Sequence, residues 1–198
     1  MSNPPAGTTA GCGSPHWGAG EIIAVDLDGV SEVVGDGPPG LGWSMEWLPD
    51  GPVRQVADAI AFPNGMIVTP DNSTLIVAES FAGRLTAFDI AADGNLSNRR
   101  VWAEGIGPDG NCLDAEGAVW TQMFTGSACV RVRQGGQVLE TIALDRSPFA
   151  CMLGGPDGRT LFILAAEWRG IEKVDEALAA RTGQVLTVRA PAPRAGWP

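Results

Sequence analysis

The chain has 198 residues, of which 44% are hydrophobic and 18% are charged. This balance is typical of a globular domain that is long enough to bury a core, and it argues against a disordered chain. The formal net charge of −10 argues against nucleic acid as a partner, because an acidic surface repels phosphates. No apolar run approaches the roughly 20 residues that cross a bilayer, so we expect no membrane association.

The first residues of the sequence do not predict a secretory signal. Residues 1–16 have neither the basic start nor the apolar core that such a signal requires. We interpret them as a flexible lead-in to a single domain over residues 17–198, in a cytoplasmic protein.

Histidine and cysteine are scarce. His16 is the only histidine, which argues against a Ser-His-Asp triad and against a multi-histidine metal site. The four cysteines have no CxxC or CxxH spacing, so neither a zinc site nor a disulfide framework is expected. We expect buried, reduced thiols instead. The cysteines are Cys12, Cys112, Cys129 and Cys151.

The front of the chain predicts strands in an irregular order. Residues 20–36 predict two strands joined by an Asp-Gly turn. Residues 41–51 resemble the first strand of a four-stranded unit and its turn, whereas residues 53–58 resemble the last strand. Because the middle strands are missing between them, we predict a poorly packed seam at Gly51-Pro52.

Three repeated units follow, and they align on Pro63, Pro108 and Pro148. Each unit begins with an apolar strand, continues through a turn rich in Pro, Asp, Asn and Gly, and adds a second and a third strand. The first two units close with a fourth strand. The predicted units are 63–107, 108–147 and 148–190.

A repeat of about 40 to 45 residues with four short antiparallel strands is the signature of a β-propeller blade. We therefore predict an all-β chain, an incomplete β-propeller with about three whole blades plus partial blades. Helical periodicity is nearly confined to residues 171–183. There we predict a short surface helix or turn inserted in the last blade, with Gly183 as its stop signal.

Three stretches of the sequence carry a family resemblance: FPNGMIVTPDNSTLIVAESFAGRLTAFDI, GPDGNCLDAEGAVW and FACMLGGPDGRTLFILAAEWRG. Over about residues 17–190, the chain resembles the senescence-marker protein/regucalcin/gluconolactonase family. The resemblance implies a six-bladed propeller, here incomplete, that hydrolyses small lactones with one divalent cation. The implied cation is Ca²⁺ first, with Mg²⁺, Mn²⁺ and Zn²⁺ as alternatives.

The resemblance also implies site residues. The family's PNG asparagine corresponds to Asn64 and its PDG aspartate to Asp109. Both positions are metal ligands in the family, and the aspartate is also proposed to move the catalytic proton. A first-blade glutamate and a second asparagine complete the family's ligand set, but both have no counterpart here, since Glu21 and Glu46 stand outside the glutamate motif. We therefore expect weak cation binding and low or absent activity.

The residue types at positions 64 and 109 also fit this chemistry by themselves. Asn64 and Asp109 directly follow aligned prolines, so they begin inner strands that converge on the channel mouth of a propeller. An amide oxygen and a carboxylate suit Ca²⁺ or Mg²⁺ and match soft metals poorly. The alternative is that PNG and PDG only mark turns, which Asn-Gly and Asp-Gly favour.

Other residues are weaker candidates for substrate contact. Phe149 takes the equivalent place in the third unit and either contacts the substrate at the channel wall or packs in the core. Glu79 and Glu167 both end second strands, where they either line the pocket or remain solvated. Trp168 and Arg169 are expected at the pocket rim.

Two functions from different classes follow from these observations. The first is a divalent-cation-dependent hydrolase of a small lactone or sugar-derived substrate, with Asn64 and Asp109 as ligands and Asp109 as the proton acceptor. The second is a non-catalytic propeller remnant that acts as a binding or interaction module. An incomplete propeller exposes unpaired strand edges, which predicts self-association through open blades.

Overall fold

A computed structural model describes residues 14–16, 21–25, 31–36, 42–46, 54–123 and 126–195 of the chain. Contacts divide the chain into two compact units, Met1–Ile60 and Ala61–Pro198. Within the described ranges, no helix is long and apolar enough to cross a membrane.

The first unit contains two small antiparallel sheets. One is formed by β1 (Ser14–His16), β2 (Glu21–Val25) and β3 (Ser31–Asp36), and the other by β4 (Gly42–Glu46) and β5 (Arg54–Ile60). β2 to β5 lie in segments in which the sequence predicts strands, whereas β1 lies within residues 1–16, where no strand is predicted. The predicted seam at Gly51-Pro52 lies outside the described residues, and the domain boundary expected after residue 16 stays a prediction.

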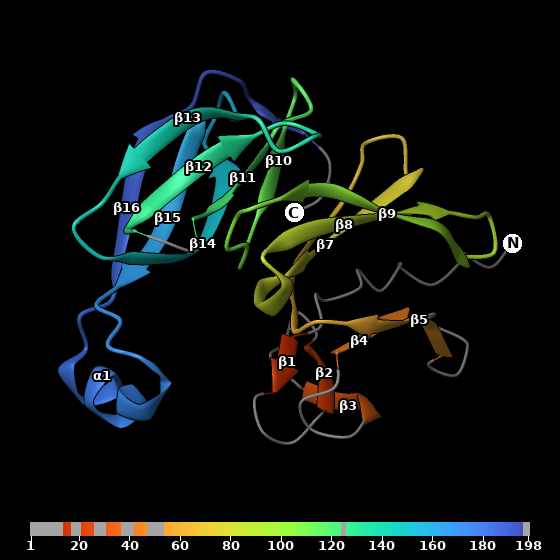
Figure 1. The fold of residues 1–198 in the computed structure, drawn as a ribbon, viewed down its shortest axis with the longest axis horizontal. Coiled ribbons are helices and arrows are strands. Elements are labelled where there is room, and N and C mark those ends of the chain that lie inside the picture. Colours follow the sequence, from red (N-terminus) through yellow and green to blue (C-terminus); the bar gives the residue numbers. More distant parts are fainter. Residues whose placement is uncertain are drawn as a thin grey trace, which may run out of the picture. The chain divides into compact units, whose positions relative to one another are not determined.

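The second unit contains three antiparallel sheets in chain order (Figure 1). The first has β6 (Pro63–Val68), β7 (Thr74–Glu79), β8 (Arg84–Ile90) and β9 (Leu96–Glu104). The second has β10 (Cys112–Asp114), β11 (Val119–Gln122), β12 (Ala128–Val132) and β13 (Val138–Ala143). The third has β14 (Ser147–Gly154), β15 (Thr160–Ala166) and β16 (Gln184–Arg189). These sheets confirm the three predicted units.

A short C-terminal strand joins the second sheet. This strand, β17 (Arg194–Ala195), pairs with β10 on the side away from β11. The inner strand of the second blade is therefore flanked by strands on both sides.

Two apolar clusters hold the three blades together. One joins the first and second blades through side chains such as Ile76, Leu85 and Val130. The other joins the second and third blades through side chains such as Trp120 and Leu161. Three of the four cysteines lie in this second cluster as buried free thiols, as predicted, and Cys12 lies outside the described residues.

The predicted helical insertion is present, but its end differs from the prediction. A 3₁₀ turn at Ile171–Lys173 leads into α1 (Val174–Ala180). The helix ends at Arg181, which takes a left-handed conformation with φ of 50°, and not at Gly183. The chain must leave the helix there, because the Thr182 hydroxyl accepts the Glu167 backbone N–H at 3.0 Å.

Candidate functional site

The beginnings of the three inner strands lie side by side. The Gly65 backbone N–H donates to the Asp109 carbonyl at 3.0 Å, and the Gly110 backbone N–H donates to the Phe149 carbonyl at 2.9 Å. Positions 64, 109 and 149 therefore adjoin one another across three blades, as the repeat predicts.

The glycines of PNG and PDG permit this close approach. A Cβ on Gly65 would lie 2.5 Å from the Asp109 carbonyl oxygen, and a Cβ on Gly110 would lie 2.6 Å from the Ala150 Cβ. Real Cβ atoms do not approach other atoms so closely. Neither glycine is among the residues with positive φ, so their role is close packing of blades. The alternative that these motifs only mark turns is therefore wrong for their glycines.

Asn64 and Asp109 lie in adjoining segments of neighbouring blades. Asn64 is exposed and Asp109 is half-buried, and Asn64 is near enough to act on the pKa of the Asp109 carboxyl. Burial raises the pKa of Asp109 to about 6, although the hydrogen bonds from Asn64 and from the Gly110 backbone act in the opposite direction. The carboxylate is thus partly desolvated and only partly compensated by donors.

Gln122 holds the loop that carries Asp109. Its Oε1 accepts the Asp109 backbone N–H at 2.8 Å, and its Nε2 donates to the Gly110 carbonyl at 2.8 Å. The Ser80 hydroxyl donates to the Pro108 carbonyl at 2.7 Å from the neighbouring blade. These positioning residues were not predicted. Gln122 ends a second strand exactly as Glu79 does, and this shared phase is the signal that could have identified it.

Glu79 is placed differently from Asp109. Its side chain is completely buried, and its carboxylate accepts hydrogen bonds from the Ala61 backbone N–H, Arg84, Arg99 and the Thr86 hydroxyl. Burial by itself raises its pKa, but the hydrogen bonds from Arg84, Ala61 and Thr86 outweigh that effect and lower the pKa of Glu79 to about 2. These bonds stabilise the ends of β7 and its neighbours, and a contact between Glu79 and a substrate stays a prediction.

Phe149 opens onto an apolar groove beside α1. The groove has a volume of about 290 Å³, and the Phe149 ring makes an edge contact with Trp168 at 5.8 Å between centroids. The other candidates lie at its border, where Arg169 pairs with Glu167 at 3.1 Å. The remaining lining residues are Ala166, Val174, Ala177, Leu178, Arg181, Thr182 and Gly183.

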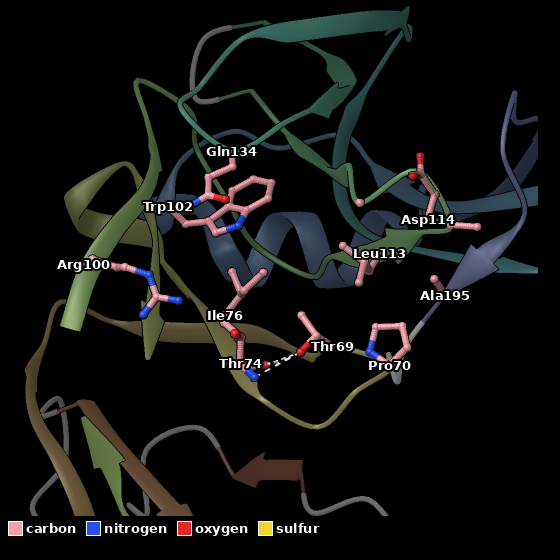
Figure 2. A pocket seen from close by; sticks show the side chains of 12 residues that line it. Thr69, Pro70, Thr74, Ile76, Arg100, Trp102, Leu113, Asp114, Gln134 and Ala195 are labelled. Atoms are coloured by element: carbon pink, nitrogen blue, oxygen red, sulfur yellow. Dashed lines mark hydrogen bonds between the residues drawn. The ribbon is translucent and has the colours of Figure 1, made fainter. Parts of the chain in front are cut away.

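A second pocket of about 330 Å³ lies away from these residues. In Figure 2, Trp102 and Gln134 lie across it from Thr69 and Pro70. Thr69 follows the end of β6, and Asp114 ends β10, whereas Asn64 lies at the start of β6 and Asp109 precedes β10. The second pocket is therefore at the opposite end of the blades.

The carboxylate of this second pocket is already engaged. Asp114 accepts the Arg131 Nε–H at 2.7 Å and the backbone N–H groups of Glu116 and Ala118 at 2.9 and 3.1 Å. Such a network stabilises the β10–β11 turn and leaves little capacity for a ligand.

The comparisons with known proteins agree with this arrangement. Residues 16–167 match the family described as the SMP-30/Gluconolactonase/LRE-like region. The chain belongs to this family. The resemblance carried by the PNG and PDG segments is thereby confirmed.

Curated members of the family match only part of their own length. Regucalcin of Xenopus laevis is 32% identical over 127 residues, which cover 60% of this chain and 42% of that protein. The 6-deoxy-6-sulfogluconolactonase of Pseudomonas putida is 32% identical over 117 residues, which cover 56% of this chain and 40% of that protein. The chain thus spans less than half the length of these relatives.

Solved structures of similar proteins show the same fold. A luciferin-regenerating enzyme gives a TM-score of 0.68 at 20% identity, covering 96% of this chain and 81% of that one. The calcium-binding protein regucalcin of Agrobacterium tumefaciens gives 0.61 at 18% identity, covering 96% and 65%. A gluconolactonase of Xanthomonas campestris gives 0.60 at 24% identity, covering 74% and 62%. The chain is therefore an incomplete propeller of the six-bladed gluconolactonase type.

Proposed function

We propose that the chain is a lactone hydrolase of reduced activity whose Asn64 and Asp109 hold one divalent cation, Ca²⁺ first. The observation that carries this proposal is that Asn64 and Asp109 adjoin at the shared strand ends, where the Gly65 backbone N–H donates to the Asp109 carbonyl and burial raises the pKa of the Asp109 carboxyl to about 6. A partly desolvated carboxylate with few donors gains from a cation. The side chains of Asn64 and Asp109 suit a hard cation, because each offers an oxygen ligand.

In this proposal, one residue of the chain accepts a proton and another holds that residue in position. When bound, the cation polarises the lactone carbonyl and lowers the pKa of a water. Asp109 in its ionised form accepts the proton of the attacking water. Gln122 keeps Asp109 in place through its two hydrogen bonds to the backbone on either side of that residue, so it acts as a positioning residue.

Phe149 is the proposed substrate contact. It follows an aligned proline as Asn64 and Asp109 do, and its carbonyl is bonded to Gly110 directly after Asp109. Phe149 therefore connects the Asp109 segment, through its backbone, to the groove that its ring shares with Trp168. We expect Phe149→Ala to raise KM for the lactone more than it lowers kcat, since this side chain binds without touching the reacting atoms.

Calorimetric titration with Ca²⁺, Mg²⁺, Mn²⁺ and Zn²⁺, together with a gluconolactone hydrolysis assay, tests the proposal. Weak binding is expected, because two side chains supply few of the about six to eight oxygens that calcium takes. Asn64→Ala and Asp109→Ala should each reduce binding, whereas Asp175→Ala on exposed α1 should not. Tight binding that survives Asp109→Ala would place the cation elsewhere. Rapid turnover by the unmodified chain would contradict the reduced activity.

One observation favours the alternative of an interaction module. In the third blade, β16 has no outer neighbour among the strands that the structure describes. Phe162 and Leu164 on β15 and Val185 on β16 are 38%, 47% and 66% exposed. An open strand edge with apolar neighbours invites pairing with another chain. Sedimentation that shows a concentration-dependent dimer, in a chain without lactonase activity, would favour this alternative.

A further inference from the structure

The Asn111 side chain has a buried oxygen that no group satisfies. Asn111 is only 4% exposed, and among the described residues its Oδ1 has no hydrogen-bond partner. Its Nδ2 donates to the Gly65 carbonyl at 3.5 Å. Exchanging the two amide atoms would set Oδ1 against that carbonyl oxygen, so the nitrogen belongs on the Gly65 side and Oδ1 remains without a donor.

Asn111 lies at the same contact between the first and second blades as Asn64 and Asp109. Its backbone nitrogen is close to Gly65, since a Cβ on that glycine would lie 2.8 Å from it. The Asn111 amide donates to the Gly65 carbonyl, and the Asp109 carbonyl accepts the Gly65 backbone N–H. Asp109 and Asn111 therefore both adjoin Gly65 of the first blade, which directly follows Asn64.

We propose that Asn111 Oδ1 is a third protein oxygen for the divalent cation held by Asn64 and Asp109. The proposal rests on the proposed function, because it adds a ligand to that same site. An unpaired buried polar atom costs stability, and a cation would supply the positive partner that the oxygen lacks. An amide oxygen is a hard ligand that suits Ca²⁺ or Mg²⁺. The missing family ligands are thus partly replaced from within the PDGN segment.

Asn111→Leu tests this role, because leucine has nearly the same branched shape and no oxygen. We expect Ca²⁺ affinity in calorimetry to fall about tenfold or more, as for the loss of a bond to a charged group. In EDTA, the Tm of this variant should equal or exceed that of the unmodified chain, since an unsatisfied amide is removed. A purely structural role, or a bound water at Oδ1, would leave Ca²⁺ affinity unchanged and would overturn the proposal.

A second variant keeps the test decisive if Asn111→Leu does not fold. Asn111→Asp adds a negative charge at the same place, so Ca²⁺ affinity at pH 7.5 should rise about tenfold. The matched control is Gln137→Glu, the same amide-to-acid change on an exposed residue before β13, which should leave the affinity unchanged. An Asn111→Asp variant that binds Ca²⁺ no better than Gln137→Glu would overturn the proposal.

The two hypotheses fail in different ways. If the unmodified chain binds no Ca²⁺ up to about 10 mM, beyond even weak calcium modules, the proposed function and the role of Asn111 are both wrong. If Asp109→Ala abolishes binding while Asn111→Leu binds like the unmodified chain, only the role of Asn111 is wrong.

Discussion

Two neighbouring blades each place a carboxylate at the end where the inner strands begin, and the two carboxylates have opposite environments. Glu79 is paired with Pro63 across β6 and β7 and is surrounded by cationic and neutral donors. Asp109 is half-buried beside an amide and a backbone N–H, and its pKa is raised to about 6. A carboxylate that accepts many hydrogen bonds stabilises the fold. A partly desolvated carboxylate with few hydrogen-bond donors is better suited to bind a cation.

The largest expected effect follows from removing the carboxylate of Glu79. Glu79→Ala leaves Arg84 and Arg99 without their buried partner, which should cost about 3–5 kcal/mol. Tm in a chain of this size should then fall by roughly 6–20 °C. Differential scanning calorimetry measures this loss. A Tm within about 2 °C of the unmodified chain would show that Glu79 is as replaceable as an exposed acid.

Lowering the pH should remove the stabilisation that Glu79 contributes to the fold. Its pKa is lowered from 4.5 to about 2 in the folded chain, so its stabilisation is present above pH 4.5 and is lost as pH falls toward 2. The amount is on the order of 2–3 kcal/mol. The stability difference between the unmodified chain and Glu79→Gln in urea titrations should therefore shrink from pH 6 to pH 3.5. A constant difference over this range would contradict the assignment.

The close approach of the blades can be tested at Gly65. Gly65→Ala places a Cβ 2.5 Å from the Asp109 carbonyl oxygen, so the backbone must shift at a cost of about 1–3 kcal/mol. The shift should also weaken cation binding, because it displaces Asn64 from Asp109. Gly183→Ala is the control, since a Cβ there meets nothing within 4 Å. Equal thermal stability of the two variants would show that the first and second blades are not closely packed at Gly65.

The smallest effect has the opposite sign and sharpens the contrast between the two carboxylates. Asp109→Asn removes a charge whose ionisation is opposed by burial, so it should stabilise the chain at pH 8 by about 1 kcal/mol after allowance for partial exposure. The same variant should lose affinity for Ca²⁺. Thermal melts in EDTA and calorimetry measure the two effects, with Asp175→Asn as the control. If the variant is less stable than the unmodified chain in EDTA, the Asp109 carboxylate stabilises the fold as Glu79 does, and the contrast between them is wrong.

The ends of the second strands show how far sequence reasoning reaches in this chain. Glu79 stands out as an acid at a repeated position, but the pattern does not reveal that four hydrogen-bonding groups donate to its carboxylate. Gln122 holds the equivalent position and binds the Asp109 backbone N–H and the Gly110 carbonyl, yet a lone glutamine carries no motif. The helix end was misplaced for a related reason, because the bond between Thr182 and Glu167 joins residues 15 positions apart.

The sequence by itself determined the number and order of the blades and the placement of Asn64 and Asp109 at equivalent points. Alternating apolar residues and turn residues act over a few neighbours, so they can be read along the chain. Only the tertiary structure decided that the PNG and PDG glycines are spacers between blades, that Asp109 is partly desolvated, and that Asn111 keeps an unpaired oxygen. These properties depend on contacts between segments as far apart as Gly65 and Asn111, which are separated by 46 positions. Burial and distance at such separations arise only when the blades pack.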